Sequence, residues 1–335
     1  MIMSSEKFGD IFSRIKNFGI IPVLKIEEAE KAVFLAEAVY AGGLSIAEIS
    51  LETDCVFESI KNIAKAMPEM LLAAGNVLTV EQAVSAAHAG ADLIISIGFD
   101  GKIAAYCAEN NIMLIPCCSN DDDIDKALSV DIDVVKILFP GINGGIGKLN
   151  VLSKKYPQVK FILSGDKINE NNLVDCLSQK PVIACGASFI FSEEDIRLGD
   201  FEKIKNLTAK TVHIMLGYDL AHVVMNCENS EQADSYSSKI ASIFGFERTD
   251  SVNFISTAGF LHFMKNKSYG KNGQIAVSTN FMDRAVFYII ESGKYFINES
   301  ARYDDNGELT SIYLDSIIGG FAIKLVLKEQ DLNKI

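Results

Sequence analysis

The stretch Asp131-Ile132-Asp133-Val134-Val135-Lys136-Ile137-Leu138-Phe139-Pro140 carries one lysine inside an apolar, β-branched run. Such a run predicts a short buried strand that stops at Phe139-Pro140. A buried ammonium group is costly unless it is paired, neutralised or used in chemistry. A desolvated lysine that loses its proton can attack a carbonyl group and form a Schiff base. The alternative is that Lys136 lies at a strand end and extends its amine to water.

An alternation of strands and helices from residue 18 to residue 190 predicts the fold around this lysine. The other predicted strands cover 20–24, 44–51, 70–75, 92–96, 112–116, 159–163 and 182–184. The predicted helices cover 27–40, 54–67, 80–89, 102–110, 121–128, a segment through 152, and 170–177. Eight such repeats with apolar strands predict an α/β fold, a parallel (β/α)₈ TIM barrel. A doubly wound open sheet is the alternative.

Composition and charge exclude several classes of partner. Of 335 residues, 49% are hydrophobic and 22% charged, and the formal net charge is −13 at pH 7. That charge predicts no nucleic-acid partner, since phosphate binding needs a basic stripe, and it disfavours an anionic membrane. Every apolar run is shorter than a membrane span, and residues 1–7 lack the apolar core of a signal peptide. We therefore expect a cytoplasmic protein with no membrane partner.

The cysteines and histidines predict neither disulfides nor a metal site. Seven cysteines include no CxxC pair, so reduced thiols are expected. The four histidines are scattered and include no HExxH-like pair.

Polar residues fall where the strands of a barrel would end, which is where barrel enzymes carry their chemistry. They are Glu48, Glu52, Asn76, Ser96, Ser119, Lys136, Ser164 and Ser188. Glu48 lies within an apolar strand, and desolvation favours the protonated form of such a carboxyl group. It therefore suits a general acid/base that works through water beside Lys136. The alternative is a purely structural Glu48–Lys136 ion pair.

Two small-residue segments follow the last two predicted strands. Ser164-Gly165 and Gly186-Ala187-Ser188 would leave backbone N–H groups free for a phosphate or carboxylate. Tight turns alone would explain the same residues.

The motifs resemble those of a known family. They are Ile20-Ile21-Pro22-Val23, Ala41-Gly42-Gly43 with Glu48-Ile49-Ser50-Leu51, Ala74-Gly75-Asn76-Val77-Leu78, Leu114-Ile115-Pro116, Val135-Lys136 with Phe139-Pro140, and Cys185-Gly186-Ala187-Ser188. On these motifs, residues 15 to 215 resemble the class I 2-keto-3-deoxy-6-phosphogluconate/4-hydroxy-2-oxoglutarate (KDPG/KHG) aldolases. The resemblance covers nearly the whole first domain, in the right motif order.

The resemblance implies a TIM barrel, commonly trimeric, that needs no metal or other cofactor and acts on a small keto acid. It makes Lys136 the Schiff-base lysine and Glu48 the acid/base. The substrate-binding residues that it implies are Glu52, Asn76, Ser96, Phe139, Ser164, Gly165, Gly186, Ala187 and Ser188.

Two departures from the family pattern change the charge of the site. Glu52 stands where the family has an arginine that binds the pyruvyl carboxylate. Asp166 follows Ser164-Gly165 where the family has Thr-Gly-Gly. Reversing a charge about 4 Å from an anion turns an attraction of roughly 4 kcal/mol into a similar repulsion. Both changes would make an anionic substrate harder to hold.

Other departures alter the shape of the site. Asn76 replaces a threonine, Ser96-Ile97-Gly98 replaces Ser-Pro-Gly, and Cys117 replaces the glycine of a Pro-Gly pair. Two residues separate Lys136 from Phe139-Pro140, where the family usually has one. Because side chains alternate along a strand, the extra residue predicts either a bulge or a change in which residue faces the barrel axis.

Residues 216–335 form a second predicted domain, after a first domain of residues 1–215. Their elements repeat, with one copy beginning near His222 and the next near Gln274. Two βαβββ repeats resemble the glyoxalase/vicinal-oxygen-chelate fold, a smaller α+β domain. In metal-using relatives the equivalent positions carry His or Glu, whereas here only His222 fits, beside Gln274 and Lys324. A catalytic metal normally needs three protein ligands, so we expect no metal and a structural or ligand-sensing role.

Three functions are open on the sequence alone. One is a Schiff-base lyase that reversibly cleaves a 2-keto-4-hydroxy acid to pyruvate and an aldehyde. Another is a Schiff-base enzyme of the same fold with a less acidic substrate. The third is a catalytically silent paralogue that binds or senses a small molecule.

Overall fold

The computed structural model describes residues 6–139 and 141–328, so Pro140 of the predicted strand stop lies outside the described residues. The chain divides into two compact units, Met1–Ile214 and Met215–Ile335. Each unit is built around its own sheet.

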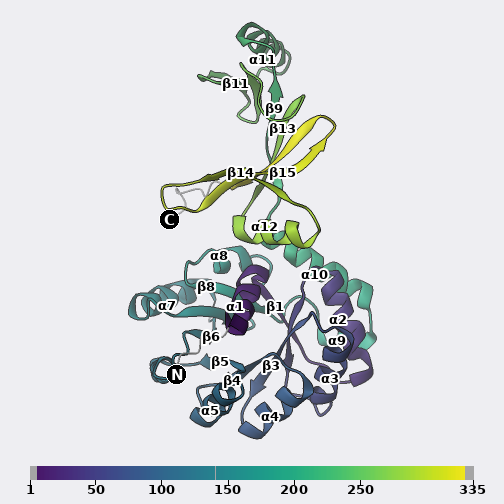
Figure 1. Ribbon diagram of the computed structural model, residues 1–335, viewed down its shortest axis with the longest axis vertical. Coiled ribbons are helices and arrows are strands. Elements are labelled where there is room, and N and C mark those ends of the chain that lie inside the picture. The colour runs from purple at the N-terminus through teal and green to yellow at the C-terminus, as the bar shows by residue number, and fades with distance from the viewer. Residues whose placement is uncertain (1–5, 140, 329–335) are drawn as a thin grey trace. The chain divides into compact units, whose positions relative to one another are not determined.

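The first unit is a closed barrel of parallel strands ringed by helices (Figure 1). Its strands are β1 (Ile20–Leu24), β2 (Ile46–Ser50), β3 (Leu71–Val77), β4 (Leu93–Ile97), β5 (Met113–Cys118), β6 (Val134–Leu138), β7 (Lys160–Ser164) and β8 (Val182–Ala187). Its helices are α1 (Glu6–Phe18), α2 (Ala32–Ala41), α3 (Val56–Ala66), α4 (Val80–Ala89), α5 (Gly101–Glu109), α6 (Asp121–Leu128), α7 (Ile142–Lys155), α8 (Leu173–Leu177), α9 (Glu193–Leu198) and α10 (Phe201–Leu216). The TIM barrel prediction is confirmed, and the open doubly wound sheet is excluded because β8 pairs with β1.

Several predicted boundaries were wrong. The helix expected over 27–40 is an α-helix only from Ala32, after a 3₁₀ turn at Ala29–Lys31. The helix expected over 170–177 begins only at Leu173, because the Asn172 side chain accepts a hydrogen bond from the Asn169 N–H and forms a turn instead. The turn expected at Gly186-Ala187 belongs to β8, because both residues pair with β1. Only Ser188 of that segment lies beyond the strand.

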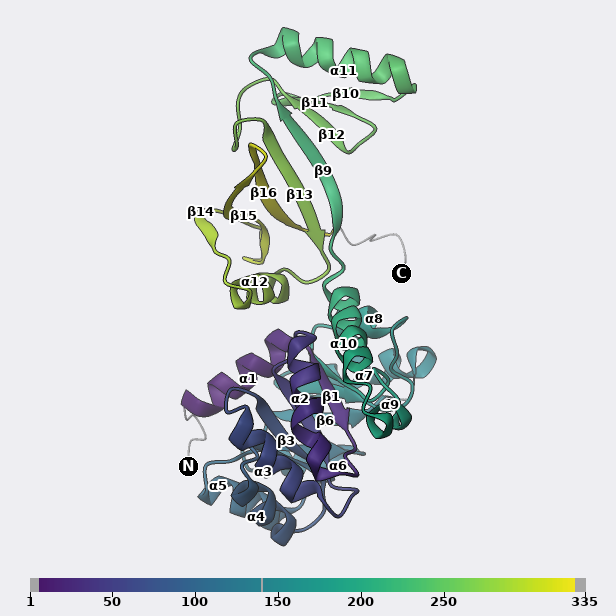
Figure 2. The same cartoon turned by 90° about the vertical axis from the view of Figure 1, so that its right-hand side faces the viewer.

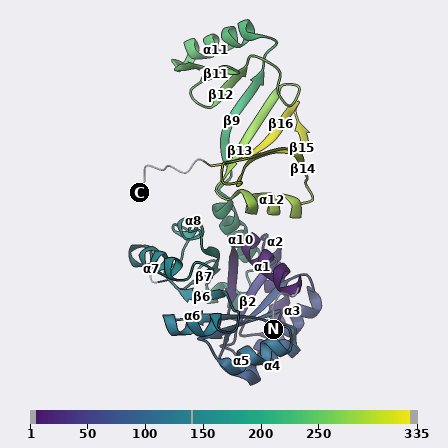
Figure 3. The same cartoon turned by 60° about the vertical axis from the view of Figure 1, so that its left-hand side comes forward.

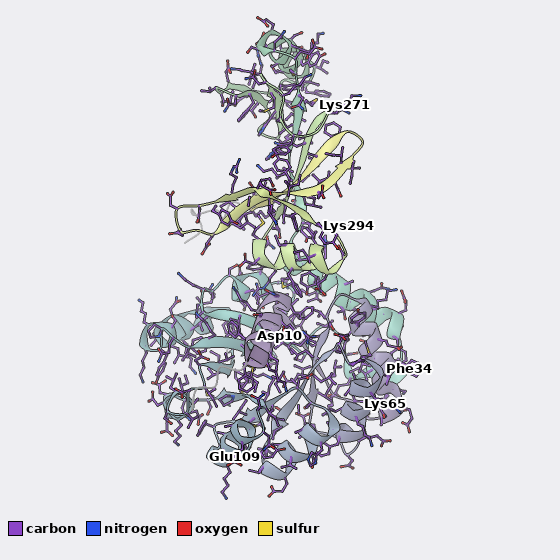
Figure 4. All side chains as sticks on the ribbon, in the orientation of Figure 1. Asp10, Phe34, Lys65, Glu109, Lys271 and Lys294 are labelled. Carbon is purple, nitrogen blue, oxygen red and sulfur yellow. The ribbon has the colours of Figure 1, made fainter. Side chains whose placement is uncertain are left out.

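Helix α1 covers the N-terminal mouth of the barrel. Ile15 is fully buried, and the Arg14 guanidinium donates hydrogen bonds to the carbonyl oxygens of Ser45 and Glu69, which precede β2 and β3. Figure 4 shows the helix over the strands, with Asp10 labelled on it. Chemistry is therefore left to the opposite mouth, where the C-terminal strand ends lie.

The second unit has two βαβββ repeats in one mixed sheet, as the sequence predicts. The first repeat is β9 (Asp219–Asn226), α11 (Ser230–Phe244), β10 (Arg248–Asp250), β11 (Phe254–Thr257) and β12 (Leu261–Met264). The second is β13 (Gly273–Thr279), α12 (Met282–Glu291), β14 (Phe296–Tyr303), β15 (Leu309–Ile318) and β16 (Phe321–Leu327). The strand order is β10-β11-β12-β9-β13-β16-β15-β14.

Both helices of the second unit cover parts of this sheet. Helix α11 lies along β10–β12 (Figure 2), where Ile255 and Phe263 form a small core. Helix α12 lies along β15 and β16 (Figure 3). Among the described residues, no helix is both long and apolar enough to cross a membrane.

We expect Ile15→Ala to lower the free energy of unfolding by about 2–5 kcal/mol, because it leaves a cavity between α1 and the barrel. Denaturant unfolding of the full chain measures the change. Ser13→Ala, on the exposed side of the same helix, is the control and should change stability by less than about 0.5 kcal/mol. Equal effects of the two variants would show that α1 does not pack as described.

Candidate active site

The centre of the candidate site is an ion pair inside the barrel. The Lys136 Nζ on β6 donates hydrogen bonds to both carboxylate oxygens of Glu48 on β2, each at 2.7 Å. Glu48 is 1% exposed and Lys136 is 6% exposed. The amine therefore faces the interior and does not extend to water, which removes one of the two sequence-based alternatives for Lys136. Lys136 and Glu48 are therefore in direct contact, as the sequence predicts.

Strand register explains why these two side chains meet. Lys136 pairs laterally with Cys117 on β5 and Ile162 on β7, and Glu48 pairs with Val23 on β1 and Ala73 on β3. Laterally paired residues of a parallel sheet point to the same side, and here that side faces the barrel axis. A two-sided contact between buried opposite charges offsets part of their desolvation cost.

Gly75 on β3 makes room for the Glu48 carboxylate. A Cβ at this position would overlap the Glu48 Oε1, Cγ and Cδ atoms. The sequence shows a glycine here but not its role, since only the barrel brings β2 and β3 side by side. Gly75 thus fixes the position of Glu48 relative to Lys136.

Asn76 adopts a left-handed backbone conformation, with φ of +61°. Asn takes this conformation more readily than other non-glycine residues, and a β-branched threonine would be strained there. Its Nδ2 donates hydrogen bonds to Ser50 Oγ and to Glu52 Oε1, both at 2.9 Å. Asn76 and Glu52, which both depart from the family pattern, are therefore hydrogen-bonded to each other at the barrel mouth.

Lys25 is a mouth residue that the sequence reasoning missed. It follows β1 two residues after Val23, so alternation directs it to the same side as Val23. Its Nζ lies 3.8 Å from Glu52 Oε2 and 3.2 Å from Glu193 Oε1. The hydrogen bond to Glu193 raises the pKa of Lys25. The mouth thus keeps a cation, just after β1, near the acidic residue at the position of the family's arginine.

The extra residue after Lys136 changes which side chain faces the axis. Strand β6 pairs with both neighbours without a register shift, so there is no bulge. Leu138 therefore shares the face of Lys136 and is 64% exposed at the mouth. Phe139 is 3% exposed and fills the space that a side chain on Gly145 of α7 would take. The structure does not bring Phe139, an expected substrate contact, to the Lys136 face.

The residues expected to bind an anion are only partly together. The Ser164 side chain lies over Gly186, with Oγ 2.9 Å from where a Gly186 Cβ would be. Gly165 has a φ of +124° and lies against the Phe139 backbone. Asp166 points outward, with its side chain 84% exposed beside Lys167.

Three further residues were expected to contact the substrate: Ala187, Ser188 and Ser96. Ala187 is buried and Ser188 is exposed beyond β8. The Ser96 hydroxyl is fully buried and donates to the Gly98 carbonyl oxygen at 2.8 Å, so its hydrogen is already used. Ser96 therefore shapes the turn after β4.

Cys117 is the neighbour of Lys136 on β5, at the position where the family has glycine. Burial raises the pKa of its thiol, while the Lys136 ammonium opposes that shift. The thiol is therefore a neutral, apolar wall of the site at physiological pH.

Comparison with known proteins places this barrel in a family. The family model described as "KDPG and KHG aldolase" matches residues 11–207, more than half of the chain. The chain belongs to the KDPG and KHG aldolase family. The match ends before the second unit, so the membership is that of the barrel.

Curated relatives agree with this membership. The 2-dehydro-3-deoxy-phosphogluconate aldolase of Treponema pallidum is 35% identical over 205 residues, which are 61% of this chain and 97% of that protein. The KHG/KDPG aldolase of Escherichia coli is 31% identical over 193 residues, 58% of this chain and 90% of that one.

A solved structure gives the same fold. The KDPG aldolase of Legionella pneumophila, crystallised with pyruvate captured as a covalent carbinolamine intermediate, has a TM-score of 0.56 and 31% identity. The alignment covers 60% of this chain and 97% of that one. The resemblance seen in the sequence motifs is therefore confirmed.

We expect Gly75→Ala to displace the Glu48 carboxylate from Lys136 and to lower the free energy of unfolding by about 1–3 kcal/mol through overpacking. Denaturant unfolding and a crystal structure of the variant measure both effects. Gly101→Ala is the matched control, because a Cβ there meets nothing within 4 Å and alanine favours the helix. An unchanged Glu48–Lys136 distance in Gly75→Ala would contradict the role assigned to Gly75.

Proposed function

We propose that the barrel is a Schiff-base aldolase that reversibly cleaves a 2-keto-4-hydroxy acid to pyruvate and an aldehyde. The proposal is carried by the buried contact of the Lys136 amine with both oxygens of Glu48. A lysine nucleophile needs to lose its proton, and a carboxylate in direct contact is the group that can take it.

The first step is a proton transfer within the pair. The proton passes from the Lys136 ammonium to the Glu48 carboxylate, which leaves a neutral amine and a carboxylic acid. Both products are uncharged, so burial favours this exchange over separation of the two charges. The amine then adds to the C2 carbonyl of the keto acid. Glu48 returns its proton to the departing hydroxyl, and water leaves as the iminium forms.

The iminium accepts the electron pair of the C3–C4 bond as that bond breaks. The C4 hydroxyl gives its proton to Glu48, directly or through water, and the aldehyde departs. Glu48 then protonates C3 of the enamine, and water releases pyruvate and regenerates the amine. One carboxyl group close to the amine thus serves every proton transfer.

The covalent carbinolamine of pyruvate in the Legionella pneumophila relative supports this proposal, because it is the first adduct expected of such a lysine. We also propose a cytoplasmic homo-oligomer, a trimer by resemblance, with a domain boundary at residues 215–216. The glyoxalase-like ancestry of the second unit stays a prediction that its element order supports.

Trapping tests the proposal directly. Pyruvate and sodium borohydride should fix a reduced adduct on Lys136, located by peptide mass spectrometry. Lys136→Arg should give no adduct at that position. Lys160→Arg, which changes the lysine that begins β7, is the control and should leave the adduct intact. Absence of an adduct on folded wild-type protein would contradict the aldolase and favour a catalytically silent binding protein.

The mouth charges should act on substrate affinity in opposite directions. Glu52→Gln removes a negative charge but keeps the Asn76 contact, so we expect the KM for the keto acid to fall roughly threefold to tenfold. Lys25→Met removes the cation beside it and should raise the KM by a similar factor. Steady-state cleavage of 2-keto-3-deoxy-6-phosphogluconate and 4-hydroxy-2-oxoglutarate measures both variants.

Asp166→Asn is the control for this pair, because its carboxylate is exposed beside Lys167. It should change the KM by less than about twofold. A KM that moves in the same direction for Glu52→Gln and Lys25→Met would show that neither charge acts on the substrate.

A further inference from the structure

One face of the second unit carries basic side chains in a single row across the sheet. His222 on β9 pairs with Ala276 on β13, Ala276 with Lys324 on β16, and Lys324 with Tyr313 on β15. Laterally paired residues point to the same side of a sheet. His222, Lys324 and Tyr313 therefore share one face.

The helix α11 packs on the opposite face. Its core contacts are Ile255 and Phe263, with Met225 packed against them. Met225 lies three residues after His222 on β9 and so alternates to the other side. The row of His222, Lys324 and Tyr313 is thus on the face that α11 leaves open.

Aromatic rings border this row on both sides. His222 stacks on His262 with ring centroids 4.9 Å apart, and His262 stacks on Phe254 at 4.7 Å. At the other end, Tyr313 stacks on Tyr269 at 4.5 Å. The result is a strip of flat surfaces around the basic groups.

The basic groups lack acidic partners. Within the described residues, neither Lys324 nor His222 makes an ion pair, and the Lys324 Nζ instead lies 5.5 Å from the Tyr313 ring centroid. Burial and the nearby Arg302 lower the pKa of Lys324. Burial, His262 and Lys324 lower the pKa of His222 to about 4. Lys324 is therefore a half-buried cation that Arg302 repels, and a bound anion would stabilise it, whereas the His222 ring is neutral at pH 7.

Gln274 supplies an independent observation that points to a ligand. It lies two residues before Ala276 on β13, on the same face, and is only 8% exposed. Its Oε1 is buried and has no hydrogen-bond partner. A buried polar atom without a partner is costly, and a ligand at this position would satisfy the side-chain amide in either orientation.

We propose that this face binds a small aromatic carboxylate, with Lys324 and Arg302 on the carboxylate and the His222–His262 stack against the ring. Lysine and arginine match the charge of a carboxylate, and flat rings match an aromatic body. A metal ion does not fit this site. Among His222, Gln274 and Lys324, only His222 is a usual metal ligand, and a catalytic metal normally needs three. The site belongs to the second unit and does not depend on the barrel's chemistry.

Benzoate is the probe, titrated into the full-length protein by calorimetry. Benzamide has the same ring without the charge and should bind at least roughly tenfold more weakly. Lys324→Met should weaken benzoate binding by roughly tenfold or more. Lys271→Met and Lys294→Met change exposed lysines of the same unit, both labelled in Figure 4, and should change it less than about twofold.

Location is read separately by NMR of the histidine side chains in wild-type protein, so that the test does not depend on the fold of a variant. Benzoate should shift the His222 and His262 ring signals. Absent benzoate binding, equal binding of benzamide, or binding that leaves both histidine signals unmoved would each overturn the proposal. Binding of inorganic phosphate as tight as that of benzoate would also overturn it, because the ring contacts would then contribute nothing.

Discussion

The contact between Lys136 and Glu48 is the constraint on which the barrel's chemistry depends. Two opposite charges are almost fully buried, and each satisfies the other through a two-sided hydrogen bond. Removing either partner would leave an isolated buried charge, which is strongly destabilising. The same contact gives the amine a route to lose its proton. Stability and, in the proposed mechanism, reactivity therefore depend on one pair, and Gly75 leaves space for its carboxylate.

Around that pair, the mouth of the barrel differs from the pattern of the family. Glu52, after β2, accepts a hydrogen bond from Asn76, and its carboxylate lies 3.8 Å from the amine of Lys25, after β1. The mouth therefore holds a lysine beside the glutamate that replaces the family's arginine. Leu138 and Cys117 give apolar walls beside Lys136.

The second unit carries a row of basic and aromatic groups on one face of a mixed sheet. Helix α11 packs on one face of the sheet at β10–β12, while the row of His222, Lys324 and Tyr313 lies on the other face. In a chain with a net charge of −13, two neighbouring cations such as Lys324 and Arg302 are unusual. Such groups carry a cost in the free protein that a complementary ligand relieves. The two units thus present two chemically distinct surfaces within one chain.

The sequence by itself predicted the alternating strands and helices of the barrel, the two βαβββ repeats, and the unusual positions of Lys136 and Glu48 inside apolar strands, because apolar periodicity and a charge within an apolar run are local signals. Only the tertiary structure decided the roles of Gly75 and Lys25, since these depend on which strands are neighbours. The tertiary structure also decided that Leu138, and not Phe139, faces the barrel axis. The sequence is compatible with either a bulge in β6 or a change in which side chain faces the axis. Strand β6 pairs with β5 and β7 without a register shift, so the side chain that faces the axis has changed.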